Sequence, residues 1–273
     1  MLKKGSKIAV LGCGNIGSAI ANGLVKSESV KPENIYLTRR DMQHLQKFKD
    51  RGFLTTSDNK EAVGNSDIII IGVTPQQLDD LLEDIKPALH KKVKVIMSVV
   101  SGASIKQMKG KLGNGYPVVR VMPNTAIAIQ ESMTCISAAP EDKGALDLSV
   151  QIFDKLGKSV VIHENLMVPA TALCACGIAF FMRAIRAASQ GGIEIGFHAV
   201  DALAMSAQTA KGAAAMIIEA GQHPESEVDK VTTPQGCTIS GLNQMEHSGF
   251  SSAMIKGIVT SAEKAETLYR TDD

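Results

Sequence analysis

Aromatic side chains are scarce in this 273-residue chain, which has no Trp and only 4% aromatic residues. Proteins that hold single-stranded nucleic acids stack bases on such rings, so a stacking surface is not expected. An excess of one charge is also missing, since 29 Lys and Arg are matched by 28 Asp and Glu. The formal net charge of +1 gives no electrostatic basis for binding nucleic acid or an anionic membrane.

The chain lacks the cysteine spacing of a metal site. It has no C-x-x-C pair and no His at ligand spacing from a cysteine; its five cysteines are Cys13, Cys135, Cys174, Cys176 and Cys237. We therefore predict no metal site and interpret the cysteines as small, buried residues in a reducing compartment.

Long hydrophobic runs are also few. The apolar run near the N-terminus, Ile8–Gly12, is shorter than a signal peptide requires, so we predict a cytoplasmic protein. The stretch Leu166–Met182 has no charge and reaches the lower length limit of a membrane span. It contains Pro169 and Thr171, and we interpret it as a core or subunit-interface helix rather than a membrane segment.

Short apolar runs alternate with helical patterns up to residue 163. The run Asp67–Val73 (DIIIIGV) is continuous, as expected of a strand covered on both faces. Thr74 and Pro75 then open a helix as its N-cap and first residue. Further strands are expected over Lys7–Leu11, Asn34–Thr38, Val93–Val100, Val118–Met122, Cys135–Ser137 and Val160–His163, with a helix over about 142–155. The alternation predicts an α/β fold with a Rossmann-type, doubly wound, mostly parallel sheet.

Strand signals stop after His163. Residues 164–273 hold 19 Ala against 11 in residues 1–163, and long helical patterns run over about 164–189, 198–220 and 251–269. Small side chains allow helices to approach closely. We therefore predict two domains, a nucleotide-binding domain over 1–163 and an all-helical domain over 164–273 that also forms a dimer.

A G-x-G-x-x-G pattern stands at Gly12–Gly17. It follows a predicted strand and opens a predicted helix, which is the context of a dinucleotide-binding turn. Gly12 suits the tight turn, Gly14 lets the backbone approach a pyrophosphate, and Gly17 lets the helix pack on the strand. The helix N-terminus then offers free N–H groups to the phosphates.

The end of the second strand selects the cofactor. NAD-preferring enzymes place an acid there for the ribose hydroxyls, whereas this chain has Thr38-Arg39-Arg40. Arginine holds a 2′-phosphate through several donors. We predict NADPH as the cofactor, with NADH bound more weakly. The alternative is that either Arg alone is a solvated surface residue.

The first long helix indicates the type of acceptor. Reduction of a ketone needs a general acid, which in related hydroxyacid dehydrogenases is a Lys on this helix. The stretch Glu164–Gln190 contains no Lys. A protonated imine already carries positive charge and needs no strong acid, so the sequence favours an imine as the acceptor.

The stretch VTTPQGCTISGL, Val231–Leu242, fits such an acceptor. A loop entering a helix N-terminus offers N–H groups to a carboxylate, and Gly236 permits close approach. Thr238 adds a hydroxyl that can meet a ring nitrogen. On residues alone, a capped turn between two helices explains the stretch equally well.

Four stretches, in this order, resemble the pyrroline-5-carboxylate reductase family: GCGNIG, SDNKEAVGNSDIIIIGVTPQ, RVMPNTA and VTTPQGCTISGL. The last is similar to the family signature, whose usual core is Pro-Gly-Gly-x-Thr. Members reduce 1-pyrroline-5-carboxylate to L-proline with NAD(P)H, the last step of proline synthesis. The resemblance implies a Rossmann domain joined to a helical domain that interlocks into a homodimer, and it implies that the dimers can form rings.

The resemblance also implies residue roles. Thr238 would be the catalytic residue, with its hydroxyl on the substrate nitrogen, and the loop around the substrate carboxylate would contain Val231, Thr233, Gly236 and Cys237. Together with Thr38 and Arg40 from the cofactor argument, the cofactor-binding set is Gly12, Gly14, Asn15, Ile16, Thr38, Arg39, Arg40, Asn59, Gly72, Val73, Thr74, Pro75, Val99, Val100 and Ser101.

Several positions depart from the family pattern. Most members have Ser-Gly-Ser-Gly-Pro-Ala-Tyr where Cys174–Phe180 reads CACGIAF, so a tyrosine hydroxyl is lost. The remaining departures are Thr74 for Lys, Ala126 for Pro, Gln235 for Gly and Gly221 for an acid. Three hypotheses follow: a pyrroline-5-carboxylate reductase, a paralogue acting on another cyclic imine carboxylate, or a non-catalytic NADP-binding dimer.

Overall fold

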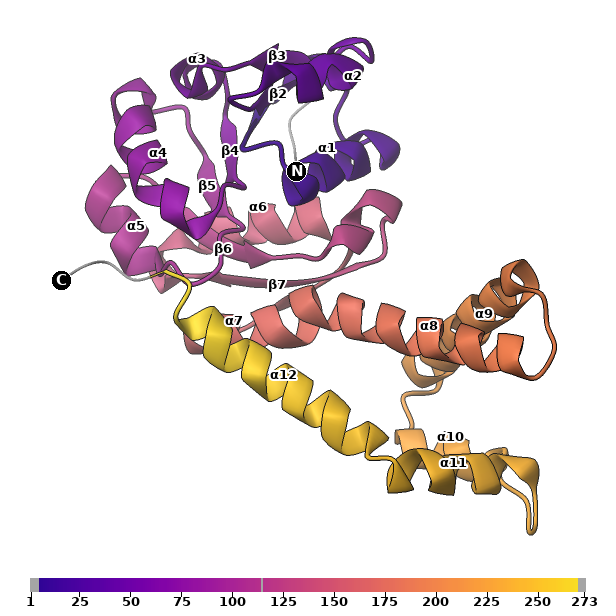
Figure 1. Cartoon of the computed structure of the whole chain (residues 1–273). Helices are drawn as coiled ribbons and strands as arrows, with labels where there is room; N and C mark the ends of the chain where they lie inside the picture. The colour runs from indigo at the N-terminus through magenta and orange to yellow at the C-terminus, as the bar shows by residue number, and fades with distance from the viewer. Residues whose placement is uncertain (1–4, 114, 270–273) are drawn as a thin grey trace. The chain divides into compact units, whose positions relative to one another are not determined.

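The computed structural model describes residues 5–113 and 115–269, and its chain divides into two compact units (Figure 1). The first unit contains the described residues up to Cys176 and those from Ser261 onward, and the second is Gly177–Thr260. The two compact units meet after Cys176, whereas the two predicted domains meet after residue 163. The ends of the two predicted domains, residues 1–4 and 270–273, lie outside the described residues.

The first unit contains one sheet of eight strands in the order β3-β2-β1-β4-β5-β6-β7-β8. All neighbouring strands are parallel except β6 and β7, which confirms the doubly wound, mostly parallel sheet. The strands are β1 (Ile8–Leu11), β2 (Ile35–Thr38), β3 (Leu54–Thr56), β4 (Ile68–Ile71), β5 (Val95–Ser98), β6 (Val118–Met122), β7 (Ser132–Ala138) and β8 (Gly157–Val161). Only β3 was not expected from the sequence.

Helices cover both faces of the sheet, which explains the continuous apolar runs. In β4, Ile68 and Ile70 pack in one buried cluster, while Ile69 and Ile71 pack in the other. The first cluster contains side chains of α1, α2 and α6, and the second contains side chains of α3, α4 and α5. The helices of this unit are α1 (Asn15–Lys26), α2 (Gln46–Lys49), α3 (Asn59–Gly64), α4 (Leu78–Ile85), α5 (Ile105–Leu112), α6 (Lys143–Phe153) and α7 (Met167–Ala170).

The helix expected over about 164–189 forms as one helical stretch, Glu164–Glu194, but it is not α-helical throughout. A 3-10 turn at Glu164–Leu166 leads into α7, a π-helical segment follows at Thr171–Cys176, and α8 begins only at Gly177. Pro169 lies in this stretch and cannot donate a backbone hydrogen bond. Met167 and Ala170 pack with Met122 and Cys135 of the sheet, so the segment up to Cys176 belongs to the first unit.

The C-terminal end of the described chain is also held by the first unit. The Tyr269 hydroxyl donates a hydrogen bond to the Asp79 carboxylate of α4 at 2.5 Å. Hydrogen bonds from Tyr269 and Lys111 lower the pKa of the Asp79 carboxyl, although its partial burial opposes them. Gly102 has φ +88°, and a Cβ atom there would be 2.8 Å from Cβ of Tyr269.

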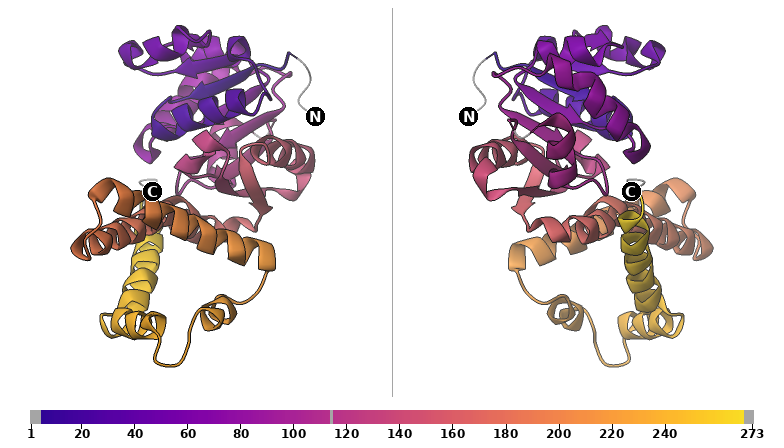
Figure 2. Two further views of the ribbon diagram at one scale, coloured as in Figure 1. Left: turned by 90° about the vertical axis from the view of Figure 1, so that its right-hand side faces the viewer. Right: turned by 90° about the vertical axis from the view of Figure 1, so that its left-hand side faces the viewer.

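The second unit is entirely helical, and no strand follows β8 in the described residues (Figure 2). Within it α8 and α9 pack side by side, and a Cβ atom on Gly192 would lie 3.0 Å from Cβ of Ala202. The helices are α8 (Gly177–Glu194), α9 (Ala199–Ala220), α10 (Pro224–Lys230), α11 (Cys237–His247) and α12 (Phe250–Glu266), of which α12 ends in the first unit.

Candidate cofactor and substrate sites

The turn after β1 and the start of α1 contain three glycines, Gly12, Gly14 and Gly17, whose surroundings differ. Gly12 has φ +87°, and a Cβ atom there would be 2.7 Å from Cγ1 of Val73. A Cβ atom on Gly17 would be 2.6 Å from the Gly12 carbonyl oxygen, so α1 packs tightly under the turn. A Cβ atom on Gly14 would meet nothing within 4 Å. The backbone at Gly14 is therefore open to a ligand, whereas Gly12 and Gly17 are fixed by neighbouring atoms.

The N-terminus of α1 follows directly. Gly14 is the N-cap and supplies no side chain to the first-turn N–H groups, and Asn15 and Ile16 form the first turn. The Cys13 N–H donates a hydrogen bond to the Thr38 carbonyl at 2.8 Å, and this bond joins the turn to the end of β2. Unpaired N–H groups and the helix dipole make such a terminus attractive to an anion.

Thr38 connects the turn to a second strand end. Its hydroxyl accepts from the Gly12 N–H at 3.3 Å and donates to the Asn59 side-chain oxygen at 2.7 Å. Arg39 donates from Nη1 to the Cys13 carbonyl at 3.0 Å, while Arg40 is exposed. Two cations therefore follow β2, one held against the turn and one in solvent.

The end of β4 forms the other wall. The Gly72 N–H donates to the Leu11 carbonyl at 2.7 Å, so the chain leaving β4 lies against the turn. Thr74 is the N-cap and Pro75 the first residue of a 3-10 turn, Pro75–Gln77, as the Thr-Pro pair predicted, and Gln77 completes a capping box that was not predicted. The ends of β1 and β4 flank the position where the strand order reverses, which is where doubly wound sheets bind ligands.

These strand ends enclose a cavity of 690 Å³. Nine of the predicted cofactor residues line it: Gly12, Gly14, Thr38, Arg39, Arg40, Asn59, Gly72, Val73 and Thr74. Asn15 lines a neighbouring cavity of 350 Å³ that also borders Gly14 and Arg39. Neither cavity is lined by Ile16, Pro75, Val99, Val100 or Ser101.

Sequence reasoning missed several lining residues. Asp80, Leu81 and Asp84 come from α4, whose other leucines, Leu78 and Leu82, are buried in the core. Cys13, Asp41, Ser57 and Gln77 complete the lining. Their position next to strand ends in the chain was the available signal.

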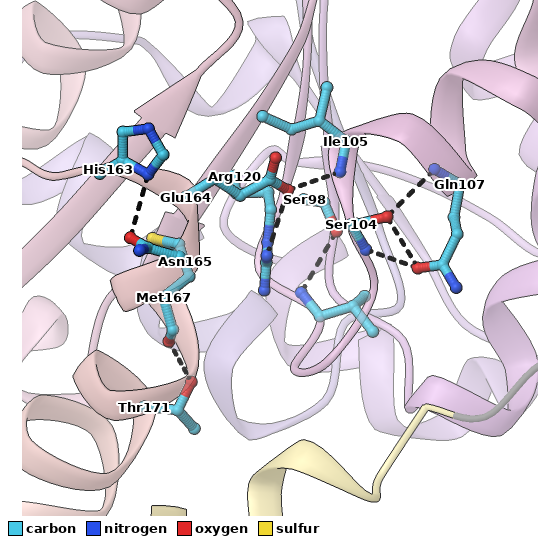
Figure 3. Close-up of polar contacts among 11 residues, drawn as sticks. Ser98, Ser104, Ile105, Gln107, Arg120, His163, Glu164, Asn165, Met167 and Thr171 are labelled. Atoms are coloured by element: carbon cyan, nitrogen blue, oxygen red, sulfur yellow. Dashed lines mark hydrogen bonds and ion pairs between the residues drawn. The ribbon is translucent and has the colours of Figure 1, made fainter.

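The loop after β5 carries Val99, Val100 and Ser101. The Val100 N–H donates to the Ser98 hydroxyl at 3.3 Å, and Ser104 caps α5 in a capping box with Gln107 (Figure 3). Val99 and Val100 are buried and Ser101 is half-buried. The loop is therefore held by hydrogen bonds at both of its ends.

Glu164, in the segment before α7, contacts both Arg120 of β6 and Ile105 at the start of α5 (Figure 3). Nη1 of Arg120 lies 3.2 Å from Oε1 of Glu164, and the same oxygen accepts from the Ile105 N–H at 2.7 Å. Burial lowers the pKa of the Arg120 guanidinium, and the Glu164 carboxylate opposes that shift. Nε and Nη2 of Arg120 are buried without a partner among the described residues. The two residues are 44 positions apart, which is why the sequence did not reveal the pair.

The predicted substrate loop lies in the second unit, between α10 and α11. Its residues Val231 and Thr233 are exposed, and the Gly236 N–H closes a turn on the Thr233 carbonyl at 2.9 Å. A Cβ atom on Gly236 would be 2.6 Å from the Thr233 hydroxyl oxygen. Close approach therefore requires glycine at this position, but the atom approached is in the loop itself.

Thr238 stands in the first turn of α11, as expected. Gly236 is the N-cap and provides no side chain, so the N–H groups at Cys237 and Thr238 have no capping oxygen from it. Thr238 is half-buried and Cys237 is exposed. A helix N-terminus with a hydroxyl in its first turn can hold a carboxylate and a ring nitrogen together.

The first unit thus has the architecture of a Rossmann-type dinucleotide-binding domain, and a helical unit follows it. The chain belongs to the pyrroline-5-carboxylate reductase family. The family model described as pyrroline-5-carboxylate reductase dimerisation matches residues 164–268, and one described as NADP oxidoreductase, coenzyme F420-dependent, matches residues 7–102.

Two relatives from Dictyostelium discoideum support the assignment. Pyrroline-5-carboxylate reductase 1 is 56% identical over 96% of this chain, and the chain spans 50% of that protein's length. Pyrroline-5-carboxylate reductase 2 is 50% identical over 97% of this chain and 93% of the relative. Among solved structures, the Plasmodium falciparum pyrroline carboxylate reductase with NADP bound superposes with a TM-score of 0.87 at 26% identity, covering 97% of this chain and 98% of that one.

Proposed function

We propose that this protein reduces 1-pyrroline-5-carboxylate to L-proline with NADPH, as the last step of proline synthesis. The main observation that supports this proposal is the cavity at the glycine-rich turn, which Arg39 and Arg40 border, in a chain of this family. The similar Plasmodium falciparum structure, which has NADP bound, supports the choice of cofactor.

The residues of the cavity fit a dinucleotide phosphate. Gly14 is open where a pyrophosphate approaches, and the α1 N-terminus provides N–H donors. Arg39 and Arg40 would hold the 2′-phosphate, and Asn59 is already oriented by the Thr38 hydroxyl. When bound, NADPH supplies the hydride. NADH lacks the 2′-phosphate and is expected to bind more weakly.

The substrate loop supplies orientation rather than acid catalysis. The N–H groups that begin α11 would bind the substrate carboxylate, and the Thr238 hydroxyl would hold the ring nitrogen. A protonated imine needs no proton from the enzyme when it accepts hydride, which agrees with the absence of Lys from Glu164–Gln190.

The testing experiment is a steady-state assay of NADPH oxidation with 1-pyrroline-5-carboxylate. A six-membered-ring imine carboxylate and a no-imine sample run beside it. Fast turnover of the five-membered ring supports the proposal. Preference for the larger ring favours a paralogue, which the change to Ile178 and Phe180 in CACGIAF would explain. NADPH binding without turnover of either imine indicates a non-catalytic dimer.

We further propose that the active form is a homodimer, and that dimers assemble into a ring. The second unit leaves large apolar side chains exposed, among them Phe181 at 64%, Val200 at 80% and Ile218 at 67%. Its match to a dimerisation family supports pairing through these helices. Light scattering on the purified protein measures the mass of the assembly.

We also propose a cytoplasmic location, which the five free thiols support because a reducing compartment preserves them. By length and composition, Glu164–Glu194 is the one helical stretch in the described residues apolar enough to cross a membrane. We assign that apolar surface to the dimer interface. Recovery of the protein in the membrane fraction after carbonate washing of lysed cells would contradict this assignment.

A further inference from the structure

Cys135 and Cys174 bring two thiols together from distant parts of the first unit. Cys135 lies on β7 and Cys174 in the π-helical segment Thr171–Cys176, and their Sγ atoms are 3.8 Å apart. A disulfide has a sulfur–sulfur distance of about 2.0 Å, so the two sulfurs must move closer before they can bond. We propose that these two thiols are a reversible oxidation site, in which a peroxide converts the pair to a disulfide.

The backbone on both sides holds the pair in place. Cys135 pairs with Met122 of β6 in the sheet, and Met122 and Met167 pack in the same buried cluster as Cys135. On the other side, the Asn124 side-chain amide donates to the Cys174 carbonyl at 3.2 Å. The thiols are therefore juxtaposed by ordered structure on both sides.

The two thiols differ in reactivity. Cys174 is half-buried and Cys135 is 4% exposed, so within one chain Cys174 is the more accessible thiol. The hydrogen bond from the Cys135 thiol lowers the pKa of Cys174 to about 7, although burial opposes the shift. The same pairing, with burial, raises the pKa of Cys135. Because the thiolate is the nucleophile, Cys174 is the attacking residue and Cys135 the resolving one.

The chemistry balances with hydrogen peroxide as the named oxidant. The Cys174 thiolate attacks one peroxide oxygen, the O–O bond breaks, and a sulfenic acid and hydroxide form. The Cys135 thiol then attacks the sulfenic sulfur, the S–O bond breaks, and the disulfide and water form. Both sulfurs are oxidised and one peroxide is reduced. Neither cysteine is among the predicted cofactor-binding or substrate-loop residues, although Cys174 begins the CACGIAF stretch. The cross-link is measured without an activity assay, so its outcome does not depend on the proposed reductase function.

The other cysteines serve as controls. Cys176 is half-buried, and burial raises the pKa of its thiol. Cys13 is buried and its pKa is raised by burial, while Cys237 is exposed. The full-length chain with Cys176→Ser leaves one cysteine in the tryptic peptide 159–183, so a cross-link to peptide 121–143 identifies the Cys135–Cys174 pair without ambiguity.

The experiment treats this folded variant with stoichiometric peroxide, blocks free thiols, and digests it without reductant. We expect the 121–143 and 159–183 peptides to appear as one cross-linked species that dithiothreitol separates. With Cys135→Ser added, Cys174 should stop at the sulfenic acid, which dimedone traps. With Cys237→Ser added instead, the cross-link should persist.

Two results would overturn the proposal. One is that Cys135 and Cys174 stay fully alkylated while Cys237 is oxidised. The other is that Cys174 forms disulfides with a second chain rather than with Cys135. A further readout is the rate of Cys174 alkylation by iodoacetamide, which should rise through about pH 7; a rise only near the pH of an ordinary thiol would contradict the assigned order of attack.

Discussion

The two units bury their apolar side chains to different extents. In the first unit every strand from β4 to β6 is buried along its whole length, between two layers of helices. In Gly177–Thr260, all of which the structure describes, Ala202 is the one buried hydrophobic residue. The first unit therefore completes its core within a single chain, and the second does not.

This difference in burial explains why the packing of the first unit can be predicted from its sequence and that of the second cannot. A strand buried on both faces needs a continuous apolar run, as in β4, and the pattern alone indicates the fold. A helix that pairs with another chain has apolar residues whose partners lie outside the sequence. Such a helix is easily predicted, but its packing is not. Each prediction below tests one side of this contrast.

Phe181→Asp should have the largest effect, on the second unit. Burying Phe181 is worth about 2 kcal/mol, and a twofold-symmetric dimer counts it twice, so association should weaken about 1000-fold. Sedimentation velocity across a concentration series measures this. Phe181→Leu keeps an apolar side chain and should stay dimeric, as should Gln190→Asp at an exposed polar position of α8. An unchanged dimer in Phe181→Asp would place the interface elsewhere.

Glu164→Ala should have the next largest effect, in the first unit. It leaves the buried Arg120 guanidinium without its carboxylate and removes the acceptor of the Ile105 N–H. Because the Glu164 side chain is 33% exposed, we expect a loss of about 3 kcal/mol, the lower end for a broken buried pair. Urea unfolding at fixed protein concentration measures it.

Two variants calibrate that loss. Glu164→Gln keeps a neutral acceptor and should fall between wild type and Glu164→Ala. Glu131→Ala changes an exposed acid of the same unit and should leave the unfolding midpoint nearly unchanged. Equal midpoints for all three variants would mean that the pair contributes no stability.

Arg39→Asp combined with Arg40→Ala tests the cofactor side of the first unit. The change removes both cations after β2 and adds an acid suited to ribose hydroxyls. Losing charged hydrogen bonds to the 2′-phosphate should lower the NADPH over NADH preference in kcat/KM about 100-fold. Lys49→Asp, which reverses a charge at an exposed position on α2, is the control for a change of charge away from the cavity. An unchanged ratio would remove the 2′-phosphate assignment.

Thr238→Ala tests the substrate loop of the second unit. Loss of one hydrogen bond to a charged group should lower kcat/KM for the imine roughly 10- to 150-fold. Thr238→Ser keeps the hydroxyl and should retain most activity. Full activity in a folded Thr238→Ala enzyme would assign the nitrogen contact to another group.

Local patterns identified most of the first unit. The apolar runs located seven of its eight strands, and G-x-G-x-x-G located the turn at Gly12. The short strand β3 was missed because Leu54–Thr56 has no long apolar run and is only half-buried. The helix start at Thr74 and Pro75 was predictable because an N-cap residue followed by Pro is a signal contained in two neighbouring residues.

Contacts between residues far apart in the chain could not be predicted from the sequence. The Arg120–Glu164 pair and the Cys135–Cys174 pair join segments that only the folded sheet brings together. The π-helical turn before Gly177 has no clear sequence signal either, since the sequence predicted only that this stretch is helical. In the loop of the second unit, the sequence showed that Gln235 departs from the family pattern, but it did not show which backbone conformation Gln235 adopts.

The smallest expected effect concerns that departure. Gln235 has φ +58°, in the left-handed region, where the family signature usually has Gly. Gln235→Gly should relieve backbone strain and raise the free energy of unfolding by about 1 kcal/mol. The matched control is Gln244→Gly inside α11, which should lower it by about the same amount because helical glycine is unfavourable. If the two Gln-to-Gly changes shift the free energy of unfolding in opposite directions, backbone conformation decides the effect. If both changes destabilise the protein, the Gln235 side chain stabilises the loop by more than its strained backbone costs.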